Sequence, residues 1–145
     1  MMELNELRRG FDLPEEDREH LDARGLPWET VSEKDNQWLL IHDFPIPEGY
    51  SHRSVMAAIR IPANYPTAGL DMVYFHPSLA REDGIRIPAT TEGTVVIDGC
   101  SFQQWSRHRT AANPWRPEID QISTHLSLVE EWLLREFPVK GVTPS

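Results

Sequence analysis

The sequence has 145 residues, the usual size of one domain, and can bury a stable core without a disulfide bond or structural metal. Its 23 acidic and 14 basic residues give a net charge of -9, which disfavours nucleic acid as a partner. A single cysteine, no signal-like N-terminus and no apolar run long enough to span a membrane predict a cytoplasmic protein, with one domain over residues 1–145 and an ordered core over roughly 10–138.

The first predicted element is a short helix from about Pro14 to Arg24. Pro14 suits the first turn of a helix, and the acidic residues after it lie near the positive end of the helix dipole. Gly25 is a natural stop. The residues before Pro14 are expected to form a loosely held arm.

Four strands are predicted next, because short apolar runs are separated by turn residues. They cover residues 28–32, 37–44, 54–61 and 70–75. No helical pattern separates these runs, which favours an antiparallel meander over a parallel sheet.

Residues 79–95 predict a long loop, because they combine charges with glycine, proline and threonine. A loop of this length inside a compact domain is usually functional, and a short extended piece is expected at 95–97. The last element is a helix of about twenty residues that begins at Arg116 and ends before Pro138. Its apolar stripe consists of Ile119, Ile122, Leu126, Val129 and Leu133.

The reactive side chains gather between the long loop and the last helix. Cys100 is followed by Arg107, His108 and Arg109, and nearby cationic groups stabilise a nucleophilic thiolate. The alternative is a buried cysteine that acts as a small hydrophobic residue. His108 has an equivalent alternative as a hydrogen-bonded loop histidine.

Common catalytic and cofactor motifs are absent from the sequence. It contains no CxxC, HExxH, GxGxxG, Walker-type lysine loop or GxSxG, so no metal and no organic cofactor is predicted. One rival from another class is a small hydrolase or metal-dependent enzyme. Its candidate residues are His76, His108 and His125 with Asp71 or Asp98.

Several short motifs resemble those of the ubiquitin-conjugating fold. They are Tyr65-Pro66, His76-Pro77-Ser78, the lone Cys100, and Trp105 or Trp115. The strings QWSRH at 104–108 and WRP at 115–117 are similar to prokaryotic family E of this superfamily, over roughly residues 10–137.

The resemblance implies an α+β fold with an N-terminal helix, a four-stranded antiparallel meander, a long active-site loop and a C-terminal helix. It implies a bacterial ubiquitin-conjugating-like enzyme in which Cys100 accepts a ubiquitin-like modifier from an activating enzyme as a thioester and passes it on. The implied partners are the ubiquitin-like protein, the activating enzyme and a metalloprotease that removes the modifier.

The resemblance also suggests roles for individual residues. His108 would assist onward transfer, oriented by Ser106 or Asp98, and Arg107 would stabilise the thiolate or bind the partner. His76 and Trp105 complete the supporting set.

The sequence departs from the family pattern in two places. Ser78 occupies the position of the asparagine that stabilises the oxyanion, and Cys100 lies farther from His76 than usual. These departures leave open a catalytically inactive variant of the fold that acts as a binding scaffold in the same pathway.

Overall fold

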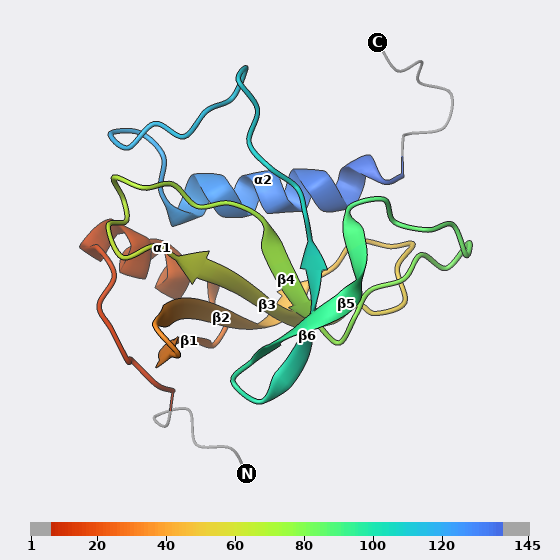
Figure 1. Ribbon diagram of the computed structural model, residues 1–145, viewed down its shortest axis with the longest axis horizontal. Coiled ribbons are helices and arrows are strands. Elements are labelled where there is room, and N and C mark those ends of the chain that lie inside the picture. Colours follow the sequence, from red (N-terminus) through yellow and green to blue (C-terminus); the bar gives the residue numbers. More distant parts are fainter. Residues whose placement is uncertain (1–6, 138–145) are drawn as a thin grey trace.

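The computed structural model describes residues 7–137, apart from the side chains of residues 91 and 92. Two helices pack with one six-stranded antiparallel sheet, whose strand order is β1-β2-β3-β4-β6-β5 (Figure 1). The elements are α1 (Glu15–Arg24), β1 (Trp28–Glu33), β2 (Asn36–Pro45), β3 (Ser54–Ile61), β4 (Val73–His76), β5 (Thr90–Ile97), β6 (Cys100–Trp105) and α2 (Ile122–Arg135).

The α+β class and the antiparallel meander predicted from the sequence are confirmed. The first predicted helix is α1, which ends where Gly25 adopts a left-handed conformation. The four predicted strands are β1 to β4, and consecutive strands pair antiparallel in that order. The predicted start of β4 at residue 70 was early, because β4 begins at Val73.

The predicted long loop over 79–95 was wrong from Thr90 onward. β5 begins at Thr90 and forms a hairpin with β6, which adds two strands to the predicted four. The turn between them is Asp98-Gly99, both with positive φ, as the tightest hairpin turns require. An Asp-Gly pair between apolar residues is a recognised hairpin signal, and the extended piece predicted at 95–97 is only the end of β5.

The second helix is shorter than predicted, because it begins at Ile122 rather than Arg116. Residues 116–120 form a separate turn, in which the backbone N–H groups of Ile119 and Asp120 donate to the Arg116 carbonyl. Gln121 has extended backbone angles and caps the helix together with Thr124. Ile119 therefore lies outside the stripe and is 59% exposed.

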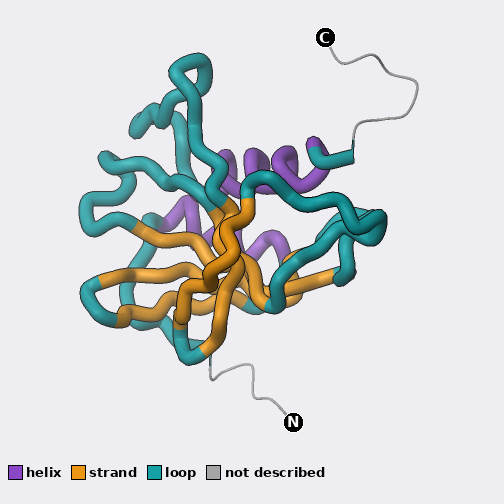
Figure 2. Tube along the Cα trace, turned by 45° about the vertical axis from the view of Figure 1, so that its right-hand side comes forward, coloured by secondary structure: helices purple, strands orange, loops and turns teal. Residues whose placement is uncertain are grey.

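Side chains alternate between the two faces of the sheet along each strand. Both faces bury apolar residues. Leu39 and Ile41 of β2 belong to the main core, which also contains Leu126 and Val129 of α2. Trp38 and Leu40 belong to a second, smaller cluster on the other face. Figure 2 shows the helices behind the strands.

The second cluster shows that the sheet curls. Val31 of β1 and Ile97 of β5 come from the two ends of the strand order, yet both are buried in this cluster. The β5–β6 hairpin therefore folds over the sheet face that α2 does not cover. Neither described helix is long and apolar enough to cross a membrane.

Candidate active site around Cys100

Cys100 is the first residue of β6 and follows the Asp98-Gly99 turn directly. It pairs with Ile97 across the hairpin. The thiol is free, and the side chain is partly exposed while packing against the second cluster. Cys100 is thus neither fully buried nor fully open to solvent.

His76 is a predicted site residue whose strand, β4, is paired with the strand that begins at Cys100. It ends β4, and its Nδ1 donates a hydrogen bond to the Ser101 carbonyl oxygen at 2.9 Å. Its ring lies 5.4 Å from the ring of Phe102, centroid to centroid. Cys100 and Phe102 are two residues apart on one strand, so their side chains and His76 share a sheet face. The Nδ1 contact leaves the lone pair of Nε2 available as a proton acceptor.

Asp98 faces the N-terminal arm (residues 7–13). Its carboxylate accepts two hydrogen bonds from Arg8, at 2.8 and 2.6 Å, and its backbone N–H donates to the Glu33 carboxylate at 2.9 Å. The Arg8 guanidinium lowers the pKa of Asp98. Asp98 therefore holds the hairpin turn and does not orient His108.

Arg107 and His108, which follow Trp105, are both paired with carboxylates. Arg107 binds Glu136 at 2.8 Å. His108 Nδ1 lies 2.7 Å from the Asp71 carboxylate. These pairs lie beyond the end of β6, where the chain turns toward α2.

The structure does not bring Cys100 and His108 together. Cys100 begins β6, and His108 follows its other end. At about 3.3 Å per residue, the strand alone spans roughly 17 Å. Figure 1 shows the β5–β6 turn and the loop that follows β6 on opposite sides of the molecule.

Trp105 and Ser106, the remaining predicted supporting residues, hold the end of β6 in place. Trp105 is fully buried, and its Nε1–H donates to the Gln103 side chain at 2.9 Å. The Ser106 backbone N–H donates to the Ala89 carbonyl at 2.7 Å, and its hydroxyl oxygen accepts from Gln104. Both residues join β6 to its neighbours rather than to the thiol.

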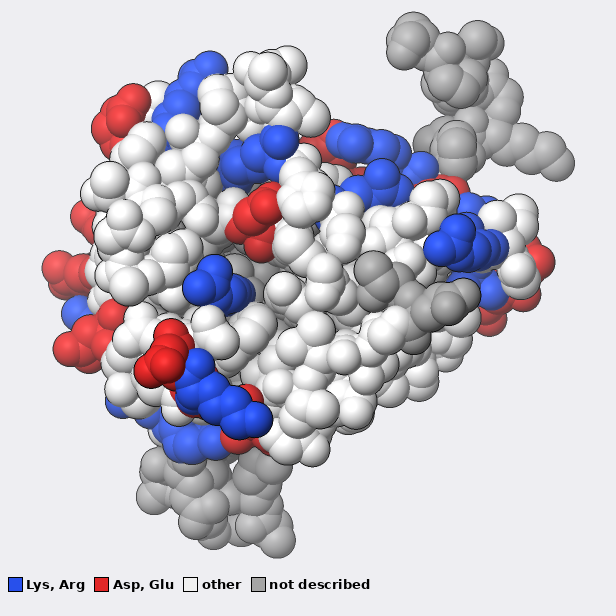
Figure 3. All heavy atoms as spheres, in the orientation of Figure 1, with Lys and Arg blue, Asp and Glu red and all other residues white. Residues whose placement is uncertain are grey.

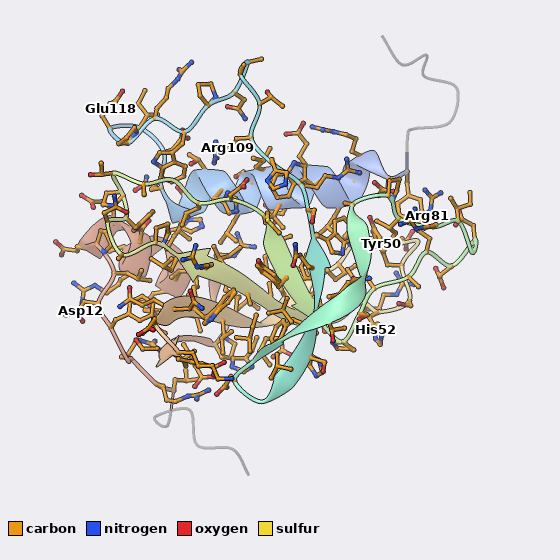
Figure 4. All side chains as sticks on the ribbon, in the orientation of Figure 1. Asp12, Tyr50, His52, Arg81, Arg109 and Glu118 are labelled. Carbon is orange, nitrogen blue, oxygen red and sulfur yellow. The ribbon has the colours of Figure 1, made fainter. Side chains whose placement is uncertain are left out.

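Trp115 also helps to fasten the loop between β6 and α2 through aromatic contacts. Trp115 donates from Nε1 to the Pro66 carbonyl at 2.9 Å, and its ring lies 6.0 Å from that of Tyr65. Arg109 stacks over Trp115 at 4.9 Å and lies between this loop and α2 (Figure 4). Residues of the WSRH and WRP strings thus connect the loop after β6 to the rest of the fold.

Of the residues proposed for a hydrolase or metal site, His108 and Asp71 meet, but they do not form a metal site with the others. Within residues 7–137 no group of three or more histidine, cysteine or acidic side chains is arranged to hold a metal ion. His125 is fully buried, and its Nε2 donates to the Met72 carbonyl. Burial lowers the pKa of His125 to about 4.

Sequence reasoning missed a charged network beside the hairpin turn. Arg8 binds Glu29 as well as Asp98, and His42 Nε2 lies 2.7 Å from Glu29. Burial by itself raises the pKa of Glu29, but hydrogen bonds from Arg8 and His42 outweigh it and lower the pKa to about 2. No local motif identifies this network, since its members meet only after β1, β2 and the hairpin are in place.

The face that carries the hairpin shows no large patch of one charge sign. Acidic and basic side chains lie around a largely uncharged central area (Figure 3). Recognition of a highly charged ligand on this face therefore has no electrostatic support.

A family model matches most of the chain. The family model described as Prokaryotic E2 family E matches residues 13–136. No curated protein and no solved structure matches the chain.

Proposed function

This chain belongs to prokaryotic E2 family E, and from that premise we propose that Cys100 carries a ubiquitin-like protein as a thioester. The Cys100 thiolate attacks the thioester carbonyl of the modifier on an activating enzyme. The activating enzyme's cysteine leaves as the thiol, taking up the proton that Cys100 lost. Any nucleotide chemistry belongs to the activating enzyme.

One observation carries the proposal: the only thiol of the chain is partly exposed on the sheet face that also holds His76. A thiol must lose its proton before it attacks a carbonyl. His76, with Nδ1 bound to the Ser101 carbonyl, presents Nε2 as the acceptor for that proton. We assign no step to His108, because Asp71 holds its ring at the other end of β6.

The second candidate function is binding without catalysis. Two features favour it: Arg107 and His108 are paired with carboxylates instead of the thiol, and Cys100 packs against an apolar cluster. In this function the chain holds a ubiquitin-like protein and its activating enzyme without a covalent bond. The metalloprotease partner stays a prediction in both cases.

A reconstitution distinguishes the two functions. The purified chain is mixed with a ubiquitin-like protein, its activating enzyme and ATP, and then run on gels with and without reductant. An adduct that reductant removes, and that Cys100→Ala does not form, supports the thioester. Complex formation that is equal in wild type and Cys100→Ala, with no adduct, supports the scaffold.

A further inference from the structure

Arg8 joins the N-terminal arm to the tip of the β5–β6 hairpin. Its Nη1 and Nη2 donate to both oxygens of Asp98, and its Nε donates to Glu29 of β1 at 2.9 Å. The planar guanidinium suits this arrangement, because it forms paired hydrogen bonds with carboxylates. One side chain of the arm thus bridges the first strand of the sheet and the last hairpin.

The arm itself is fixed along the edge of β1. The Thr30 backbone N–H donates to the Arg8 carbonyl at 3.0 Å, and the Gly10 N–H donates to the Thr30 carbonyl at 2.7 Å. A Cβ atom at Gly10 would lie 2.9 Å from that carbonyl oxygen, so the close approach requires glycine. Arg8 therefore reaches Asp98 from a defined position.

From these contacts we propose that Arg8 is a positioning residue for the turn that carries Cys100, so that the N-terminal arm controls access to the thiol. The inference rests on the proposed role of Cys100 and names a regulator of the same site. Asp98 and Cys100 flank Gly99, so any movement of Asp98 moves the first residue of β6. Displacing the arm removes the Arg8 contact from the turn and makes the partly exposed sulfur more accessible.

The Arg8–Asp98 contact is accessible to solvent. The side chains of Arg8 and Asp98 are 48% and 35% exposed, and solvent screens such pairs. The Asp98 backbone N–H keeps its bond to Glu33 when Arg8 leaves. The turn therefore loosens without loss of the whole hairpin.

The test measures how fast iodoacetamide alkylates Cys100 in the folded full-length chain. Arg8→Ala and Asp98→Ala are each expected to raise the rate by about two- to fivefold, as expected from losing one exposed ion pair. Arg8→Lys keeps the charge without the paired geometry, so its rate should lie between wild type and Arg8→Ala. Arg53→Ala is the matched control, because Arg53 is 74% exposed and pairs with Glu48, outside the hairpin.

A double-mutant cycle separates positioning from general loosening. If both residues act through their contact, Arg8→Ala with Asp98→Ala alkylates no faster than either single variant. About 1 M sodium chloride, where the Debye length is about 3 Å, should accelerate wild type but not Asp98→Ala. Midpoints of thermal unfolding, measured in parallel, show whether a variant has simply become less stable.

Two outcomes overturn the inference: alkylation rates that equal wild type in both single variants, or effects that multiply in the double variant. The proposed function of Cys100 is tested independently of this inference. If the Arg8 and Asp98 variants react faster with iodoacetamide but the wild type forms no thioester in the reconstitution, access control stands and the acyl-carrier role does not.

Discussion

Trp115 packs directly over Gly69, and no side chain fits between them. A Cβ atom at Gly69 would lie 2.7 Å from the Trp115 Cβ and would overlap its ring. This contact, with the Trp115 hydrogen bond to Pro66, fastens the loop after β6 to the loop that precedes β4. It also determines where His108 lies, because the same loop carries both residues.

Gly69→Ala is expected to displace Trp115 and destabilise the fold by about 1–3 kcal/mol, the usual range for an overpacked site. Urea denaturation followed by tryptophan fluorescence measures the change. Gly93→Ala is the control, because a Cβ atom there meets no other atom within 4 Å. Equal stabilities for the two variants would contradict the contact.

Tyr50→Phe is expected to lower the free energy of unfolding by about 1–2 kcal/mol. The Tyr50 hydroxyl group donates to the Leu133 carbonyl of α2 at 2.7 Å in a buried position, so the carbonyl loses its side-chain partner. Tyr50 and Arg81 lie together near the C-terminal end of α2 (Figure 4). Tyr74→Phe is the control, since the Tyr74 hydroxyl makes no hydrogen bond within residues 7–137. A loss in both variants would point to a cause other than this bond.

The stability of the fold should decrease between about pH 6.5 and pH 4 because of His125. The unfolded chain binds a proton near the ordinary histidine pKa of 6.5, whereas the buried ring stays neutral until about pH 4. The unfolded state therefore gains protons first, and stability is lost as the pH falls through this range.

His125→Gln keeps a donor for the Met72 carbonyl but does not titrate. Wild type should lose up to about 1.4 kcal/mol per pH unit more than this variant over that interval. Denaturation midpoints at several pH values provide the measurement. Parallel pH profiles would show that His125 is not responsible.

His76→Ala should slow thioester formation by about tenfold or more, whereas His108→Ala should change it by less than about twofold. The reason is position, because His76 shares a sheet face with Cys100 and His108 does not. His76→Asn retains a donor for the Ser101 carbonyl without a proton acceptor, so it should fold normally and remain slow. Single-turnover assays with loaded activating enzyme give these rates. A larger effect of His108→Ala would restore it as the assisting histidine.

Much of the fold follows from local sequence patterns. Helix α1 and strands β1 to β4 could be predicted because proline, glycine and alternating apolar residues act over a few neighbouring positions. The Asp98-Gly99 pair contained the signal for the β5–β6 hairpin, but the surrounding threonines and charges suggested a loop. The beginning of α2 was missed because a separate turn at 116–120 precedes the true cap at Gln121.

The sequence by itself determined the family, the meander and the presence of one candidate nucleophile. Only the tertiary structure decided which side chains surround that nucleophile. Arg8 meets Asp98 across 90 positions in the sequence, because the sheet curls. His108 meets Asp71 across 37 positions, because the loop after β6 packs against the loop before β4. Closeness in sequence placed His108 beside Cys100, but the extended strand β6 carries them apart, since a strand separates residues that a helix or a turn would keep together.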